Sequence, residues 1–190
     1  MSKRLLFLVA ALLLMSVTAV AVMAQDAPSI SVSDQISSGS VVIDSVFSDG
    51  PGFVVVRGSG GRGSPGPVLG HTAVGPGLTE NVVVDLVLDL ATGQLFAALH
   101  TDDTNEGTWD FGITAGADAP VAVDGELVQQ LFTAQVIEMS DQPVAEDNTV
   151  FADTIVTNAA GWLVIHSDDG GSPGPVLGFA PLRAGRNANV

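Results

Sequence analysis

The octapeptide GSPGPVLG occurs twice in this chain, at residues 63–70 and, with all eight residues identical, at residues 171–178. It lies within a longer match between two parts of the sequence, at an offset close to 108 residues: 33–35 pair with 140–142, 41–48 with 150–157, 52–56 with 161–165, and 77–82 with 185–190. The small insertions and deletions fall between apolar runs. This period is too long for a solenoid repeat and indicates a tandem duplication of a whole domain.

The apolar runs in the duplicated region are short, rich in Val and Ile, and bounded by Gly, Pro, Asn and Asp, which is typical of β-strands. Strands are expected in the first copy at residues 29–33, 40–48, 52–58, 67–74, 80–91, 94–102 and 129–139. No segment has a sustained helical period, although 125–131 is long enough for one helical turn. The pattern predicts an all-β chain: an immunoglobulin-like antiparallel β-sandwich followed by a partial second copy of the same domain.

The strand expected at 80–91 has the clearest alternation. Its apolar residues on one face are Val82, Val84, Leu86, Leu88 and Leu90. One buried face and one wetter face is what an antiparallel sandwich sheet requires. The short segment 91–94 then predicts a hairpin turn into the next strand.

Within the octapeptide, residues 64–67 (Ser-Pro-Gly-Pro) predict a tight turn, because Pro fixes φ at the second position and Gly tolerates a positive φ at the third. Pro67 then begins a strand, and Gly70 allows a bulge or a close approach of another backbone. An exposed ligand-binding loop is the alternative interpretation. The preceding Gly-rich stretch 58–63 does not indicate a phosphate-binding loop, since neither a Lys nor a helix follows it.

The second copy is incomplete in this sequence. Its last residue, Val190, pairs with Val82, and counterparts of residues 83–131 are absent. We therefore divide the region after the N-terminal segment into a complete sandwich at 27–139 and a truncated repeat, with only the first four strands, at 140–190. Residues 1–24 are assigned to a signal peptide on the separate evidence given below. Half a sandwich leaves an apolar face and a strand edge uncovered. Three interpretations remain open: the sequence is a fragment, the half-domain folds back on the first domain, or strands of another chain complete it.

The N-terminal segment has the pattern of a cleavable secretory signal peptide. Lys3 and Arg4 precede an apolar run at 5–22, and residues 22–24 (Val-Met-Ala) resemble a cleavage site. We expect cleavage after Ala24 and a protein that is secreted or held at the cell surface. The alternative is a retained transmembrane anchor, because an apolar run of this length is near the minimum for crossing a bilayer.

The chain is acidic, with 21 Asp and Glu against 6 Lys and Arg, and it contains no Cys. Loss of residues 1–24 leaves four Arg, no Lys and a formal net charge of −17. Nucleic acids and anionic membranes are bound by clustered Lys and Arg, so we expect neither as a partner, and no membrane contact beyond the signal segment. The absence of Lys would suit a high-salt habitat. Without disulfides, an exported domain depends on its hydrophobic core alone.

The segment 100–111, HTDDTNEGTWDF, is the most suggestive of ligand binding. Asp103, Asn105 and Asp110 offer hard oxygen ligands at short spacing around a Gly, an arrangement that suits Ca²⁺. The segment lacks the terminal bidentate Glu and the flanking helices of a twelve-residue calcium loop. Calcium is the one cofactor that we consider. The alternative is an acidic surface loop that Trp109 and Phe111 anchor to the sandwich.

The three His do not form an evident metal cluster. His71 aligns with Phe179, which favours a packing role, and His166 aligns with Arg57 at a strand end, which favours exposure. His100 alone has carboxylates beside it, whereas zinc requires three or four convergent ligands. The chain has no Cys nucleophile and no Ser in a nucleophile-elbow pattern. We therefore assign no catalytic residue and do not expect an enzyme.

Together these features resemble a repeated domain family of unknown function, found in secreted and cell-surface proteins of haloarchaea and some bacteria. The resemblance is carried by 33–35 (Ser-Asp-Gln), 52–53 (Gly-Phe), 68–70 (Val-Leu-Gly), the 100–111 segment and a closing strand near 131–137. It covers about 27–139 and part of 137–190. It implies an exported β-sandwich, often in tandem, and carries over no catalytic residue.

The sequence therefore predicts a non-enzymatic β-sandwich module of the cell surface or extracellular space, with a structural, adhesive or protein-interaction role. The expected partners are other envelope proteins or a second copy of the chain, engaged through the incomplete repeat. The alternative is a calcium- or small-ligand-binding sandwich that uses the 100–111 segment. A carbohydrate-active enzyme is a more distant third option, for which Trp109 and Trp162 would have to act as platforms rather than anchors.

Overall fold

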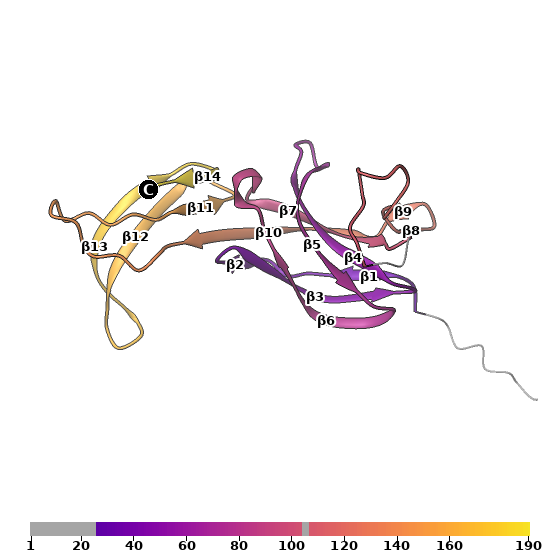
Figure 1. Cartoon of the computed structure of the whole chain (residues 1–190). Helices are drawn as coiled ribbons and strands as arrows, with labels where there is room; N and C mark the ends of the chain where they lie inside the picture. The colour runs from indigo at the N-terminus through magenta and orange to yellow at the C-terminus, as the bar shows by residue number, and fades with distance from the viewer. Residues whose placement is uncertain (1–25, 104–106) are drawn as a thin grey trace, which may run out of the picture.

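The computed structural model describes residues 26–103 and 107–190, which form a nearly all-β structure (Figure 1). Its strands are β1 (Ser29–Ser31), β2 (Gln35–Ser37), β3 (Ser40–Ser48), β4 (Gly52–Ser59), β5 (Pro65–Val74), β6 (Gly77–Asp85), β7 (Gln94–Thr101), β8 (Ala122–Val123), β9 (Glu126–Leu127), β10 (Gln129–Glu138), β11 (Thr154–Thr157), β12 (Gly161–Asp168), β13 (Pro173–Leu182) and β14 (Gly185–Ala188). A 3₁₀ helix lies at Leu88–Leu90. In the described ranges no helix has the length and apolar character needed to span a bilayer.

The first copy is a sandwich of two sheets. One sheet has the strand order β1-β3-β6, and the other runs β10-β7-β4-β5 within this copy. These ladders are antiparallel, and β2 is added in parallel beside β10. The chain thus alternates between the sheets as in immunoglobulin-like sandwiches, which confirms the predicted fold class.

The core lies between the two sheets because alternate side chains of each strand point inward. Its fully buried members come from both sheets and include Val41 and Ile43 of β3, Val84 of β6, Val54 and Val56 of β4, and Leu99 of β7. Each such side chain contributes roughly 1.5–3 kcal/mol relative to an exposed one. Since the chain has no Cys, this burial is what stabilises the sandwich.

The connection between the sheets differs from the prediction. The strand expected at 80–91 ends at Asp85, because the chain there leaves the first sheet. β6 pairs with β3, whereas β7 pairs with β4 and β10, so the hairpin turn predicted at 91–94 is wrong. This segment instead bridges the sheets, and Thr92 Oγ1 accepts a hydrogen bond from the Ser59 N–H at 2.9 Å.

The octapeptide begins a strand rather than forming a turn. β5 starts at Pro65, so the tight turn predicted at 64–67 is wrong. The chain reverses just before it, where the φ angles of Gly61, Arg62 and Gly63 are 83°, 54° and 76°. Glycine adopts a positive φ without steric cost, and here Gly61 and Gly63 flank Arg62. The Gly-rich stretch therefore has a structural role in this reversal of the chain.

The two octapeptides make matching contacts. A Cβ on Gly66 or Gly174 would lie 2.9 or 3.0 Å from a carbonyl oxygen of the neighbouring strand. The Gly66 carbonyl oxygen accepts a hydrogen bond from Arg57 Nε at 2.9 Å. In the second copy, His166 Nδ1 lies 2.7 Å from the Gly174 carbonyl oxygen. The glycine shared by the two octapeptides therefore allows a close strand approach in both copies.

The Ser-Asp-Gln motif also folds alike in both copies. Gln35 and Gln142 each exchange two hydrogen bonds with one backbone residue of a neighbouring segment, at 2.6–2.9 Å. The motif Ser donates to the carboxylate of Asp44 in the first copy, at 2.7 Å, and of Asp153 in the second, at 2.9 Å. These contacts show that the second copy retains the local structure of the first.

Two short elements depart from the sequence pattern. No helical turn forms at 125–131; instead β8 and β9 make a small hairpin, with Asp124 and Gly125 at φ 52° and 87°. The three-residue strand β2 lies outside the predicted set. Its parallel pairing with β10 joins segments about 100 residues apart, which local periodicity does not reveal.

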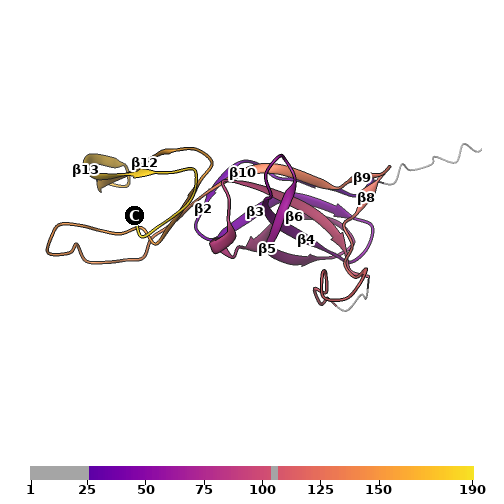
Figure 2. The same ribbon diagram turned by 90° about the horizontal axis from the view of Figure 1, so that it is seen from above.

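The second copy shares a strand with the first. The C-terminal part of β10 pairs with β11, and β11 with β14, so that β10-β11-β14 repeats the order β1-β3-β6. The register is repeated too: Ile137 lies opposite Ile155, as Ile30 lies opposite Val46. β12 and β13 form a separate two-stranded sheet at the place of β4 and β5. In Figures 1 and 2 this hairpin lies at the far end of the molecule and does not fold back over the first sandwich.

Candidate functional site

The β12–β13 hairpin leaves one strand edge open. In the first copy, β4 is paired on both sides, with β5 on one edge and β7 on the other. Among the described residues, β12 has β13 as its one strand partner. The edge at 161–167 therefore presents backbone N–H and C=O groups that have no ladder partner there. Such an edge is a template for another strand.

The inner face of the hairpin is also uncovered. Leu69 and Leu177 occupy the same place in the two octapeptides, yet Leu69 is 2% exposed and Leu177 is 69% exposed. A cavity of about 610 Å³ opens at this face, and its lining includes Leu163 and Ile165 of β12. In the first copy the equivalent residues Val54, Val56 and Leu69 are buried in a core to which β3, β6, β7 and β10 also contribute.

The outer face of the hairpin carries exposed aromatic residues. Phe53 and Val55 of β4 are 2% and 0% exposed, whereas their equivalents Trp162 and Val164 are 63% and 40% exposed. Phe179, which is 70% exposed, makes an edge-to-face contact with Trp162 at 5.5 Å between ring centroids. Together, the inner residues Leu163, Ile165 and Leu177 and the outer residues Trp162, Val164 and Phe179 form an open apolar hairpin, and we use that name below.

In the first copy, a loop after β7 covers this outer face. Trp109 lies over the sheet, with ring centroids 5.3 Å from Phe53, 4.9 Å from His71 and 5.3 Å from His100. Phe111 lies 5.4 Å from Trp109 and packs against the same cluster. The predicted anchoring role of Trp109 and Phe111 is confirmed, and it identifies what covers this face in a complete copy.

A buried histidine lies under this loop. His100 is 1% exposed, and its Nδ1 lies 2.7 Å from the carbonyl oxygen of Asp118, so Nδ1 donates the hydrogen bond. Asp118 is itself fully buried, and its carboxylate accepts from the Asp110 N–H. Within the described residues, His100 Nε2 and Asp118 Oδ1 have no hydrogen-bond partner. Burial lowers the pKa of His100; the Asp118 contact opposes this shift, and the charge on Arg57 adds to it.

We expect this histidine to make stability depend on pH. Its pKa is lowered in the folded state from 6.5, so between the two pKa values the unfolded chain binds more protons. The free energy of unfolding should therefore fall as pH drops below about 6.5, by at most about 1.4 kcal/mol per pH unit for this group. Urea unfolding between pH 5 and 8 measures the slope. His100→Phe should reduce it, and an unchanged slope in that variant would contradict the assignment. His71, whose pKa burial also lowers, contributes in the same direction.

The calcium prediction concerned Asp103, Asn105 and Asp110. Asp103 Oδ2 accepts a hydrogen bond from the Ala119 N–H at 3.4 Å, and Asp110 donates its own N–H to Asp118. Asn105 lies outside the described residues. In residues 26–103 and 107–190, no group of three or more His, Asp or Glu is arranged to hold a metal ion. The calcium site stays a prediction.

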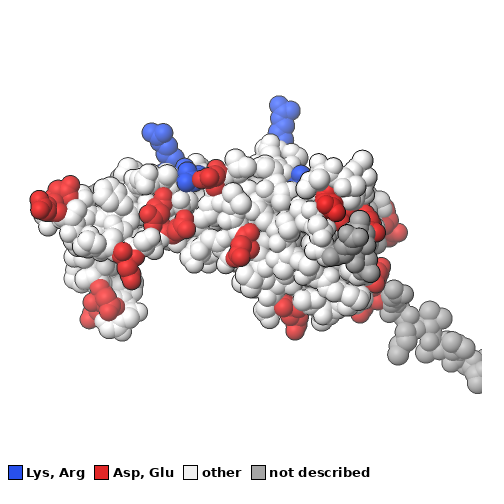
Figure 3. Space-filling view, viewed as in Figure 1, with Lys and Arg blue, Asp and Glu red and all other residues white. Residues whose placement is uncertain are grey.

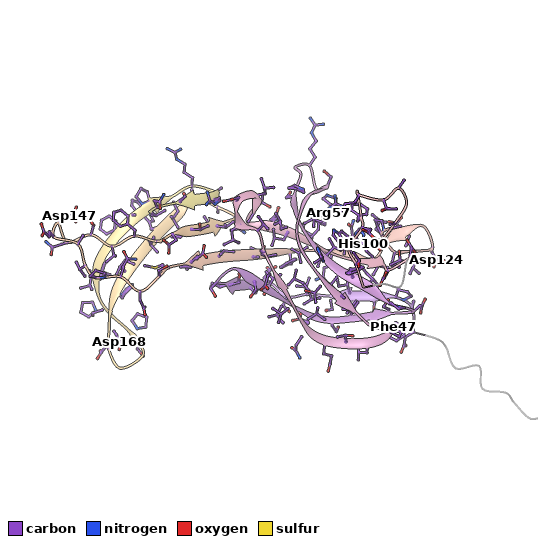
Figure 4. All side chains as sticks on the ribbon, viewed as in Figure 1. Phe47, Arg57, His100, Asp124, Asp147 and Asp168 are labelled. Atoms are coloured by element: carbon purple, nitrogen blue, oxygen red, sulfur yellow. The ribbon has the colours of Figure 1, made fainter. Side chains whose placement is uncertain are left out.

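Charged side chains are spread along both copies (Figure 3). Figure 4 places Arg57 and His100 in the first sandwich, and Asp147 and Asp168 at the distal end of the second copy. Arg186 of β14 forms an exposed ion pair with Asp89 at 3.3 Å, which links the two copies. An exposed pair of this kind stabilises by no more than about 1 kcal/mol. Strands β11 and β14 of the second copy are joined to the first sandwich through the shared strand β10.

Comparison with known proteins agrees with this arrangement. One family model, described as a domain of unknown function (DUF7282), matches residues 28–136 and again 134–190. The two matches meet inside β10, the strand that both copies share. Searches of curated proteins and of solved structures gave no match. The sandwich and its partial repeat thus match one family model twice, and the chain belongs to the DUF7282 family of domains of unknown function.

Proposed function

We propose that this protein is an exported, non-enzymatic module of the cell surface that binds other proteins through the open apolar hairpin of its second copy. The observation that carries the proposal is the contrast between equivalent residues: Leu69 is buried and Leu177 is exposed within identical octapeptides. A contiguous exposed apolar surface on a folded protein is typical of an interaction site. Export is supported by the sequence pattern of residues 1–24.

The hairpin combines two features that favour protein partners. Its exposed aromatic residues, Trp162 and Phe179, are of the types enriched at protein interfaces. Its open edge provides backbone groups that an extended partner segment satisfies by adding a strand. A small ligand would cover part of the apolar surface but would not pair with the edge. A protein partner fits both features at once.

A retention experiment tests the proposal. Immobilised protein should retain envelope proteins of its own host or soluble copies of itself. The double variant Trp162→Asp/Phe179→Asp should lower retention about tenfold, because it places charges in the apolar surface. Leu78→Asp is the matched control, since Leu78 is 64% exposed on the first sandwich and lies outside the hairpin. N-terminal sequencing of protein recovered outside the host cells should begin at Gln25.

Absence of retention for the unmodified protein would overturn the proposed function. Equal losses in the double variant and in Leu78→Asp would show that the hairpin is not the contact surface. Circular dichroism of each variant establishes that the sandwich remains folded, so that a loss of retention reports on the surface itself.

A further inference from the structure

We infer that the two copies form one rigid body, so that the protein acts as a stiff spacer that holds them at a fixed distance and orientation. This inference goes beyond the proposed function and does not depend on it. Tandem domains usually move relative to each other, because few contacts cross the flexible linker between them. Three features of the junction between the copies oppose such motion here: a shared strand, a shared core and a direct contact between backbones.

The copies are connected by a strand and not by a linker. β10 runs from the first sandwich into the second copy without interruption (Figure 1). Its residues 129–133 pair with β7, 134–136 with β2 and 136–138 with β11, so every residue of β10 has a ladder partner. A hinge needs residues that are free to change φ and ψ. A hinge within β10 would therefore break ladder hydrogen bonds.

The composition of this part of β10 also differs from that of a flexible linker. Flexible linkers are rich in Gly and Ser. Residues 133–138, Thr-Ala-Gln-Val-Ile-Glu, contain no Gly, Ser or Pro. They include β-branched residues, which restrict the side chain and favour extended backbone. The sequence at the junction thus favours a continuous strand.

The hydrophobic core crosses the junction. Val136 of β10 lies opposite Val156 of β11, and each of them is 1% exposed. Both belong to one cluster of buried residues with Leu99 of β7. Val156 is a residue of the second copy, so its burial joins the second copy to the core of the first. Separation of β11 from β10 would expose both valines to water, which opposes relative motion of the copies.

Gly93 brings the backbones of the two copies into contact. It lies in the connection from β6 to β7, and its carbonyl oxygen accepts a hydrogen bond from the Ala134 N–H at 3.2 Å. A Cβ on Gly93 would overlap the backbone of Asn158, which follows β11 in the second copy. Glycine is the residue that permits such a close approach of two backbone segments. The connection from β6 to β7 is therefore fixed between β10 and the second copy.

A distance measurement between two spin labels tests the inference. The chain has no Cys, so Glu80→Cys in β6 and Ala188→Cys in β14 place one label on each copy. Both residues are exposed. Double electron–electron resonance of the doubly labelled protein should give a single narrow distribution of distances. A broad distribution, as expected for copies that move independently, overturns the inference.

Gly93→Ala in the labelled protein should broaden the distribution about twofold or shift its centre, because the added methyl group forces the two backbones apart. Gly75→Ala is the matched control, since a Cβ on Gly75 meets nothing within 4 Å, and it should leave the distribution unchanged. Circular dichroism establishes that both variants are folded. A Gly93→Ala distribution with the width and centre of the parent overturns the inference, because the backbone contact would then be absent in solution.

A second variant keeps the test decisive if Gly93→Ala does not fold. Insertion of Gly-Ser-Gly-Ser between Ala134 and Gln135 places a flexible linker between the part of β10 that pairs with β7 and the part that pairs with β11. The distribution should then become broad. A narrow distribution at the parent distance would overturn the inference, because it would show that the shared strand does not hold the copies together.

Discussion

Leu69→Ala should lower the free energy of unfolding of the first sandwich by about 2–5 kcal/mol, whereas Leu177→Ala should change it by less than about 0.5 kcal/mol. The two residues occupy the same position of identical octapeptides. Leu69 is 2% exposed within the core, so its truncation leaves a cavity. Leu177 is 69% exposed, so its truncation removes mainly contacts with water.

Urea unfolding followed by circular dichroism measures both variants, with Trp109 fluorescence in a Trp162→Phe background as a separate probe of the first sandwich. Comparable costs for the two substitutions would contradict the structure, because they would require Leu177 to be buried in solution. The local sequence is held constant, so the difference reports on tertiary burial alone.

Much of the first sandwich is predictable because its long strands alternate clearly. β3 and β4 lie where the Val-rich runs predict them, and β7 begins at Gln94 as expected. The connection from β6 to β7 through 91–94 was not predictable in the same way. A short connection has the same composition whether its two flanking strands pair with each other or lie in opposite sheets. Short elements such as β2 are defined by a distant partner, β10, and not by their own three residues.

In the candidate site, too, some features are predictable from the sequence and others depend on contacts between distant residues. The uncovered apolar face is predictable from the repeat, because the given sequence holds no second-copy counterpart of residues 83–131, the range that contains β7 in the first copy. The burial of His100 against Asp118 was not predictable, because these two residues are 18 positions apart and are brought together only by the tertiary structure. Asp118 has a φ of 49°, and no pattern in the sequence marks it. The sequence also does not reveal that both copies share β10, because this follows from the pairing of β10 with β7 on one side and with β11 on the other.

Gly70→Ala should destabilise the first sandwich by about 1–3 kcal/mol or more, because the position has no room for a side chain. Gly70 lies where the chain after β6 crosses β5, and the Val87 N–H donates to the Leu69 carbonyl oxygen at 2.8 Å. A Cβ on Gly70 would overlap the carbonyl oxygen of Asp85 and lie 3.0 Å from a methyl group of Val84. The register of β4 and β5 also shifts here, as the sequence predicted for a bulge or close approach.

Gly178 is the matched control, since a Cβ at this equivalent position meets nothing within 4 Å. Gly178→Ala should be neutral or stabilise by up to about 1 kcal/mol, because Ala restricts the unfolded chain. Urea unfolding of both single variants and the double variant provides the measurement, and the effects should add within about 0.5 kcal/mol, since the sites lie in different copies. A Gly70→Ala variant as stable as the unmodified protein would mean that the chain after β6 does not cross β5 at contact distance. The sandwich would then close in a different way from the one described.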